Sequence, residues 1–171
     1  MRKIPVFVSC PTSLSKKQEA QRKVLMNLLD EIQLEPRALG RGEYAKDYPL
    51  KEVFVIAKHC AGGIILGFEQ LQVTAGIRKR DTKDRKLINK TKPVSLPTPW
   101  NQLEAGILFG LKLPLLIFKE ADIEGGVFDV GISDAFVHNM PPGKPDKDKE
   151  EELKQVILKW FGEVSRKYNE Y

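Results

Sequence analysis

Short, continuous apolar runs alternate along this chain with longer segments of helical periodicity. The three plainest runs are Ile4–Val8, Gly63–Phe68 and Pro114–Phe118. Each is too short for a helix and lacks the polar alternation of a half-buried strand, so each is typical of a parallel strand covered on both faces. Two weaker runs, near Leu34–Leu39 and Ala135–His138, complete the set of predicted strands.

Four helices are predicted between and after these runs. Ser15 and Gln18 form a capping-box signature for the first, and Pro49 suits the first position of the second. Thr98 is the predicted N-cap of the third, and an amphipathic segment over residues 147–168 is the last. Strands that alternate with helices favour a parallel sheet. We therefore expect one flavodoxin-like α/β domain over residues 1–171, a three-layer sandwich whose five-stranded parallel sheet has the order 2-1-3-4-5, with helices on both faces.

Composition excludes several classes of protein. No apolar run approaches the roughly 18–20 residues of a membrane span. The first apolar run is also too short for a signal peptide, which favours a cytoplasmic location. Cys10 and Cys60 do not make a disulfide framework, and the two histidines form no cluster with zinc-ligand spacing. We therefore expect no metal and no membrane partner.

Positive charge is concentrated in one inserted segment, at about residues 69–97. Residues 78–93 hold eight Lys and Arg against Asp81 and Asp84, a charge of +6, so the rest of the +5 chain sums to −1. The segment is expected to be a solvated, mobile loop that folding does not require. It could instead attract a phosphorylated ligand or nucleic acid. Nucleic acid is the less favoured partner, because no aromatic residue is available to stack on single-stranded bases.

The expected fold directs attention to one carboxylate. Ligands of such sheets bind at the carboxyl ends of the strands, at the switch point between strands 1 and 3. The third helix starts at this edge and carries Glu104. We expect Glu104 to lie within an apolar face formed by Trp100, Leu103, Ile107, Leu108 and Leu111. A partly desolvated carboxylate in a cleft is a catalytic candidate. Alternatively, Glu104 reaches solvent at the helix edge or is favoured by the helix dipole.

Two motifs resemble those of TIR (Toll/interleukin-1 receptor) domains. Val6–Ser9 is similar to their first-strand motif, and Trp100–Glu104 is similar to the W-x-x-x-E motif of TIR domains that cleave NAD. Leu39–Asp47 occupies the place of their flexible loop. Cys10 departs from the usual aromatic, and the segment before the third helix is unusually long. The resemblance implies an enzyme of prokaryotic antiviral defence that releases nicotinamide from NAD, with Glu104 catalytic and NAD as substrate rather than cofactor.

A second resemblance points to a related reaction. Glu104–Gly106 and the following strand, over residues 113–117, look like nucleoside 2-deoxyribosyltransferases, which use a Glu nucleophile on the corresponding helix. Both families break an N-glycosidic bond, and a nearby carboxylate can stabilise or trap the oxocarbenium-like ribose. A third possibility is a TIR-like module that senses a nucleotide or mediates assembly, by self-association or with an effector protein, without turnover.

Around Glu104 we expect a set of substrate-binding residues drawn from the same edge. Trp100 offers a flat wall for a ring, and Ser9 and Thr12 could hold phosphate or ribose oxygens near a helix N-terminus. Simpler roles are a helix-capping turn over Ser9–Ser13 and an ordinary surface loop around Arg41 and Tyr44. The full expected set is Ser9, Pro11, Thr12, Arg41, Tyr44, Phe68, Glu69, Trp100 and Asn101.

A cysteine nucleophile is the less favoured alternative. Cys10 lies at the predicted ligand edge, and His59 or His138 could activate it. Cysteine is more often a small buried hydrophobe, and no third group is evident that would orient the histidine. His59 is better explained as a cation at a helix C-terminus.

Overall fold

Five parallel strands form the centre of the protein, seen here in a computed structural model that describes residues 3–40 and 48–170. Their order is β2-β1-β3-β8-β9, and all neighbours pair in parallel. When only these five strands are numbered in chain order, this is the predicted order 2-1-3-4-5. The prediction of a flavodoxin-like α/β sheet is confirmed. The strands are β1 (Ile4–Ser9), β2 (Leu34–Arg37), β3 (Gly63–Gly67), β8 (Leu115–Lys119) and β9 (Val137–Asn139).

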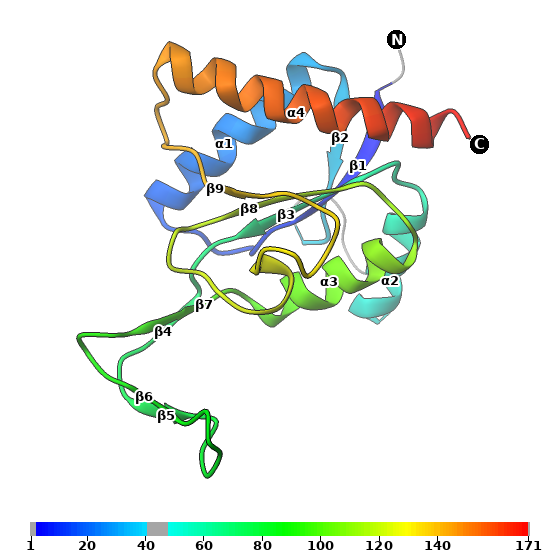
Figure 1. Cartoon of the computed structure of the whole chain (residues 1–171). Coiled ribbons are helices and arrows are strands. Elements are labelled where there is room, and N and C mark those ends of the chain that lie inside the picture. The colour runs from blue at the N-terminus through cyan, green and yellow to red at the C-terminus, as the bar shows by residue number, and fades with distance from the viewer. Residues whose placement is uncertain (1–2, 41–47, 171) are drawn as a thin grey trace.

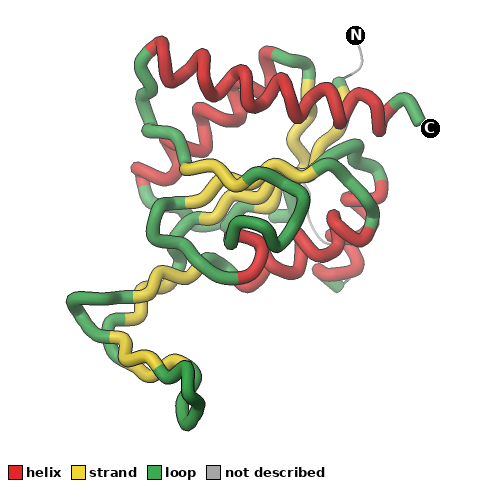
Figure 2. The backbone as a smooth tube through the Cα atoms, in the orientation of Figure 1, coloured by secondary structure: helices red, strands yellow, loops and turns green. Residues whose placement is uncertain are grey.

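Helices cover both faces of this sheet, as Figures 1 and 2 show. Helices α1 (Lys16–Glu31) and α4 (Lys147–Tyr168) lie on one face, and α2 (Pro49–Lys58) and α3 (Pro99–Gly110) lie on the other. Within the described residues, no helix is both long and apolar enough to cross a membrane.

Alternate residues of each strand enter two separate cores. Val6 and Val8 pack with α1 and α4, whereas Phe7 packs with α2 and α3. Burial on both faces explains why the strands read as unbroken apolar runs. As expected for strands covered on both faces, six of their apolar residues are at most 8% exposed: Val6, Val8, Ile64, Leu66, Leu115 and Ile117.

The helix starts follow the capping signals. The Ser15 hydroxyl accepts a hydrogen bond from the Gln18 N–H at 3.2 Å, and the Gln18 side chain accepts one from the Ser15 N–H at 3.0 Å. Thr98 caps α3 by accepting from the Trp100 N–H at 3.3 Å. Capping satisfies backbone donors that a helix leaves unpaired, so these residues set where α1 and α3 begin.

The face that α3 turns to the sheet differs from the predicted one. Trp100 is 41% exposed and Leu103 is 49% exposed, so the apolar face expected around Glu104 is not the buried face of the helix. The buried residues of the helix are Asn101, Glu104, Ala105 and Leu108. Apolar residues occur on every side of α3, so periodicity alone could not determine its rotation about its axis. The burial of Glu104 itself is confirmed.

The inserted basic segment forms an antiparallel ribbon instead of the expected irregular loop. At its base, β4 (Leu71–Val73) pairs with β7 (Val94–Leu96), and beyond a bend β5 (Gly76–Arg78) pairs with β6 (Lys86–Ile88). We call residues 71–96 the basic arm. Figure 1 shows it projecting from the body. Its strands are three residues long and packed on no core, so the sequence carries little of the apolar signal that predicts strands.

Candidate functional site

A cavity of about 290 Å³ lies at the carboxyl edge of the sheet. The chain segments that follow β1, β2 and β3 meet there with the first turns of α2 and α3. This is the switch-point position at which ligands bind in doubly wound sheets. The lining residues are Cys10, Pro11, Thr12, Leu39, Gly40, Pro49, Gln70, Thr98, Trp100 and Glu104.

Among the described residues that line this cavity, Glu104 is the one with an acidic side chain. It lies in the second turn of α3, on the side turned toward the sheet, and its exposed fraction is only 8%. Desolvation raises the pKa of Glu104 from 4.5 to about 7, against an opposing effect of a hydrogen bond from the Ser9 side chain. Near neutral pH the carboxyl is therefore divided between its protonated and ionised forms, which suits a group that must gain or lose charge during a reaction.

Two fully buried polar residues support Glu104 from the protein side. The Asn101 Nδ2 donates a hydrogen bond to the Ser9 Oγ at 2.7 Å, and both residues are 0% exposed. Because the Ser9 oxygen accepts this bond, its own hydroxyl proton is available to the Glu104 carboxylate. The result is a chain of hydrogen bonds from Asn101 through Ser9 to Glu104, which lowers the pKa that burial raises.

One atom of this hydrogen-bond chain has no partner among the described residues. Asn101 Oδ1 is buried and accepts no hydrogen bond from the residues that the structure describes. A buried acceptor without a donor costs free energy, on the order of 1–3 kcal/mol. A buried polar atom of this kind calls for an explanation, and a catalytic role nearby or a bound water are two of the known ones.

The neighbouring residue on α3 holds a loop in place. Gln102 Nε2 donates to the Gly125 carbonyl at 3.1 Å, and Gln102 Oε1 accepts from the Val127 N–H at 3.0 Å. Gly126 has a φ of +60°, and a Cβ there would overlap the Gln102 side chain. The connection between β8 and β9 is therefore fastened to α3 one residue after Asn101, which restrains the helix that carries Glu104.

The structure brings together several of the expected site residues. Pro11, Thr12 and Trp100 line the cavity with Glu104. Ser9 and Asn101 do not line it, but they bond one another beside the Glu104 carboxyl. Two further residues of the expected set, Arg41 and Tyr44, lie outside the described residues.

Two other expected residues point elsewhere. Phe68 is 0% exposed and packs in the core between the sheet, α1 and α4. Glu69 lines a second cavity of about 500 Å³, where its carboxylate accepts a hydrogen bond from the Ser95 hydroxyl. The Glu69 N–H donates a hydrogen bond to Glu120 Oε2 at 2.6 Å. This bond holds the Glu69 backbone next to Glu120, which lines the same second cavity. Glu69 is therefore not among the residues that surround Glu104.

Cys10 lines the cavity, but neither histidine does. His59 ends α2 with its Nδ1 2.8 Å from the Val55 carbonyl. His138 lies on β9 beside Phe118, and burial lowers its pKa. With no histidine in the cavity lining, the structure offers no activating partner of the kind considered for a cysteine nucleophile.

Six of the described lining residues are absent from the expected site, or had only another role in the sequence analysis. Pro49 and Thr98 were interpreted only as helix-start signals, although helix starts at the carboxyl edge of a parallel sheet face its ligand site. Gln70 follows the third strand, and this position was the available signal for it. The six residues are Cys10, Leu39, Gly40, Pro49, Gln70 and Thr98.

Three solved structures are similar to this chain, and the first of them, at a TM-score above 0.5, agrees with this architecture. A diflavin flavoprotein A3 from Nostoc sp. aligns with 99% of this chain and 97% of its own, at a TM-score of 0.52 and 13% identity. A CMP N-glycosidase from Clostridium botulinum aligns with 90% of this chain and 98% of its own, at a TM-score of 0.49 and 13% identity. A flavodiiron core from Synechocystis sp. aligns with 96% of this chain and 36% of its own, at a TM-score of 0.48 and 9% identity.

No protein-family model and no curated protein sequence matches the chain. The fold thus defines the class, an α/β protein of flavodoxin-like type. The residues of the cavity must carry any argument about activity.

Proposed function

We propose that this protein cleaves the N-glycosidic bond of a nucleotide, with NAD as the leading substrate and Glu104 as the catalytic residue. The observation that carries the proposal is the placement of Glu104. A nearly buried carboxyl with a pKa of about 7 forms part of the wall of a cavity at the ligand edge of the sheet. No described cation forms an ion pair with Glu104, and burial of an ionisable group is unfavourable for folding, so a functional reason is expected.

The reaction needs a negative charge at one place. When the bond between ribose C1′ and the base nitrogen breaks, the electron pair leaves with the base and positive charge develops on the sugar. In the cleavage of NAD, nicotinamide leaves neutral, water adds to C1′, and one proton is released. Ionised Glu104 would stabilise the positive sugar electrostatically or trap it covalently before water arrives.

Ser9 and Asn101 would hold the carboxylate in position during this step. Their hydrogen-bond chain ends on the carboxyl and restricts its rotation. A fixed acceptor geometry is what electrostatic stabilisation of a transition state requires, since a mobile group must reorganise as charge develops.

The cavity is suited to one nucleoside-sized portion of a ligand. Its volume of about 290 Å³ lies at the lower end of the range for small-molecule sites. The reacting ribose and its base would occupy it, and the remaining part of a dinucleotide would extend outward. Trp100, which is 41% exposed and lines the cavity, offers a flat surface for a ring.

The resemblance to NAD-cleaving TIR domains supports this choice of substrate. Trp100 and Glu104 occupy the first and last positions of the W-x-x-x-E pattern, and both line the same cavity although the helix exposes one and buries the other. The same resemblance suggests that the product serves as a nucleotide signal in prokaryotic defence.

Nicotinamide release is the direct test. The protein is incubated with NAD, and nicotinamide and the ribosyl product are separated by liquid chromatography. Wild type should release nicotinamide, and Glu104→Gln should release it about 10²–10³-fold more slowly. Glu163→Gln, which alters an exposed carboxylate on α4, should match wild type. Exchange of bases on deoxynucleosides would instead identify a transferase. Binding of NAD without turnover would support a nucleotide-sensing module and overturn the proposal.

A further inference from the structure

The basic arm contributes almost nothing to the two cores of the domain. Figure 1 shows it extending beyond the sheet and helices, and most of its side chains are exposed. Its apolar cross-strand pair, Ile77 and Leu87, is 41% and 61% exposed. An isolated two-stranded ribbon is marginally stable in water, so the arm gains little for folding and calls for another explanation.

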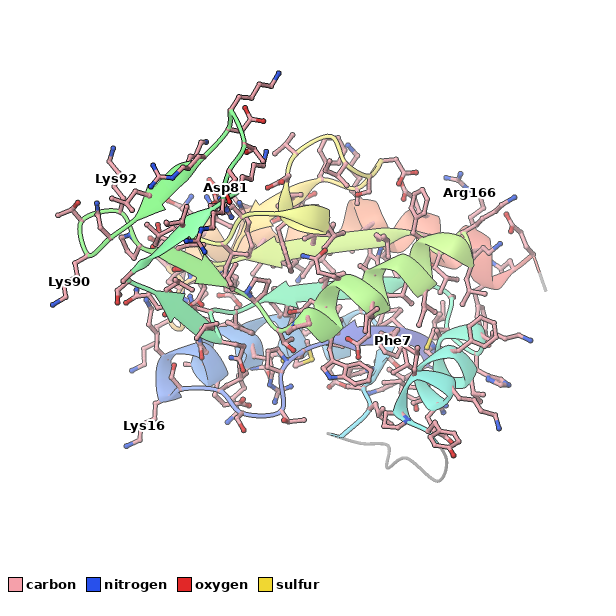
Figure 3. The ribbon with its side chains drawn as sticks, turned by 90° about the horizontal axis from the view of Figure 1, so that it is seen from below. Phe7, Lys16, Asp81, Lys90, Lys92 and Arg166 are labelled. Carbon is pink, nitrogen blue, oxygen red and sulfur yellow. The ribbon has the colours of Figure 1, made fainter. Side chains whose placement is uncertain are left out.

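Charge on the arm is strongly one-sided. Residues 78–93 contain eight Lys and Arg but only two Asp. In the described part of the chain, two of the eight form ion pairs: Arg78 with Glu124 at 2.5 Å, and Lys79 with Asp84 at 3.8 Å. The cations occur at the tip, on β6 and in the turn before β7, so they are spread along the arm. Figure 3 shows Lys90 and Lys92 extending away from the body.

The strand register also brings two of these positive charges together. Arg78 on β5 lies directly opposite Lys86 on β6, and like charges at opposite positions destabilise a ladder. The tip between them, over residues 79–85, carries four more cations. A polyanion bound along the arm would relieve this repulsion, because each phosphate can lie between neighbouring cations.

Shape and composition select among polyanions. Nothing in residues 69–97 is aromatic, so the arm cannot stack the bases of a single strand. A two-stranded ribbon has the width that the major groove of duplex DNA admits, and cations on both of its edges would then face the two phosphate backbones. An interfacial membrane segment would need a broad apolar face with anchors such as Trp or Phe, which the arm lacks.

We propose that the basic arm is a binding surface for duplex nucleic acid, held mainly by phosphate contacts and therefore with little sequence preference. This proposal is independent of the N-glycosidase activity. The arm begins immediately after Gln70 and ends two residues before Thr98, and both of these residues line the Glu104 cavity. Duplex bound on the arm would therefore lie close to the rim of that cavity.

The test measures binding of a fluorescent 20-base-pair DNA duplex by anisotropy between 50 and 200 mM NaCl. Wild type should bind with an affinity that falls linearly on a log–log plot, with a slope of about −4 if four to five phosphates are contacted. The arm variant changes five cations outside the ion pairs to Gln: Arg80, Lys83, Arg85, Lys90 and Lys92. Its affinity at 50 mM should fall at least tenfold, and its slope should approach zero.

A control variant removes the same net charge from elsewhere on the surface. It changes five exposed cations to Gln, namely Lys58, Lys147, Lys149, Lys159 and Arg166, and should retain most of the affinity and slope. Thermal unfolding checks that each variant is folded. Arg80→Lys with Arg85→Lys keeps the charge of the arm and should retain binding.

Three results would overturn the proposal. The first is a wild type that shows no duplex binding at 50 mM NaCl. The second is an equal loss in the arm and control variants, which would indicate attraction by net charge alone. The third is preference for another partner: a single strand of the same length bound as tightly as duplex, or phosphatidylserine vesicles bound when duplex is not.

Discussion

Replacing Glu104 with Gln removes a charge and leaves the shape of the side chain nearly unchanged. In the folded protein the pKa of Glu104 is raised from 4.5 to about 7, with desolvation as the main cause. At about 1.4 kcal/mol per pH unit, this difference corresponds to roughly 3 kcal/mol of folding free energy. The side chain is only 8% exposed, so little of that value is lost to solvent screening.

The sign follows from proton linkage. Between pH 4.5 and about 7 the folded state holds a proton on Glu104 that the unfolded state has released. The contribution of Glu104 to stability is therefore fully present below pH 4.5 and is lost as the pH rises through 7. Glu104→Gln stays neutral, so its stability relative to wild type should rise by roughly 3 kcal/mol between pH 4.5 and pH 8.

Urea unfolding at these two pH values measures the stability difference, and nicotinamide release at pH 8 measures catalysis. Loss of one well-placed electrostatic group typically reduces the rate by about 10²–10³-fold. Glu163→Gln on the exposed side of α4 should change neither quantity appreciably. Two results would refute the reasoning: a stability difference independent of pH, or a Glu104→Gln variant whose activity falls only in proportion to its folded fraction.

Three further substitutions test other parts of the structure. Ser9→Ala removes the hydrogen bond that lowers the pKa of Glu104, so the midpoint of the pH–rate profile should move above 7, and an unmoved midpoint would contradict this role. Gly67→Ala places a Cβ 2.5 Å from Phe128 Cε1 and should destabilise the protein by about 1–3 kcal/mol in urea unfolding, with partial recovery when Phe128→Leu is added. Ser15→Ala removes the cap of α1 and should cost about 1 kcal/mol by the same assay, whereas Ser15→Asp, which retains a capping oxygen, should cost much less.

Local patterns in the sequence were sufficient for the sheet and its order. The apolar runs at β1, β3 and β8 are buried on both faces, so they needed no detail of packing to be identified as parallel strands. Capping residues placed the starts of α1 and α3 for a similar reason, because a cap acts within one turn of its own helix. The strand order then placed Glu104 at the carboxyl edge, where the structure has its cavity.

Features that depend on contacts between distant segments could not be predicted in this way. The rotation of α3 exposes Trp100 and buries Asn101, and it is set by how the helix packs on β1 and β3. The direction of Glu69 depends on Ser95 and Glu120, which are 26 and 51 residues away.

The sequence by itself determined the class of fold, the edge of the sheet at which a ligand site is expected, and the carboxylate most suited to chemistry there. Only the tertiary structure decided which groups surround that carboxylate and what shape the inserted segment takes. The physical reason is the distance along the chain over which each kind of interaction acts. Periodicity and capping express interactions within a few residues, whereas the bond from Asn101 to Ser9 spans 92 positions and the raised pKa of Glu104 arises from burial that the whole domain creates.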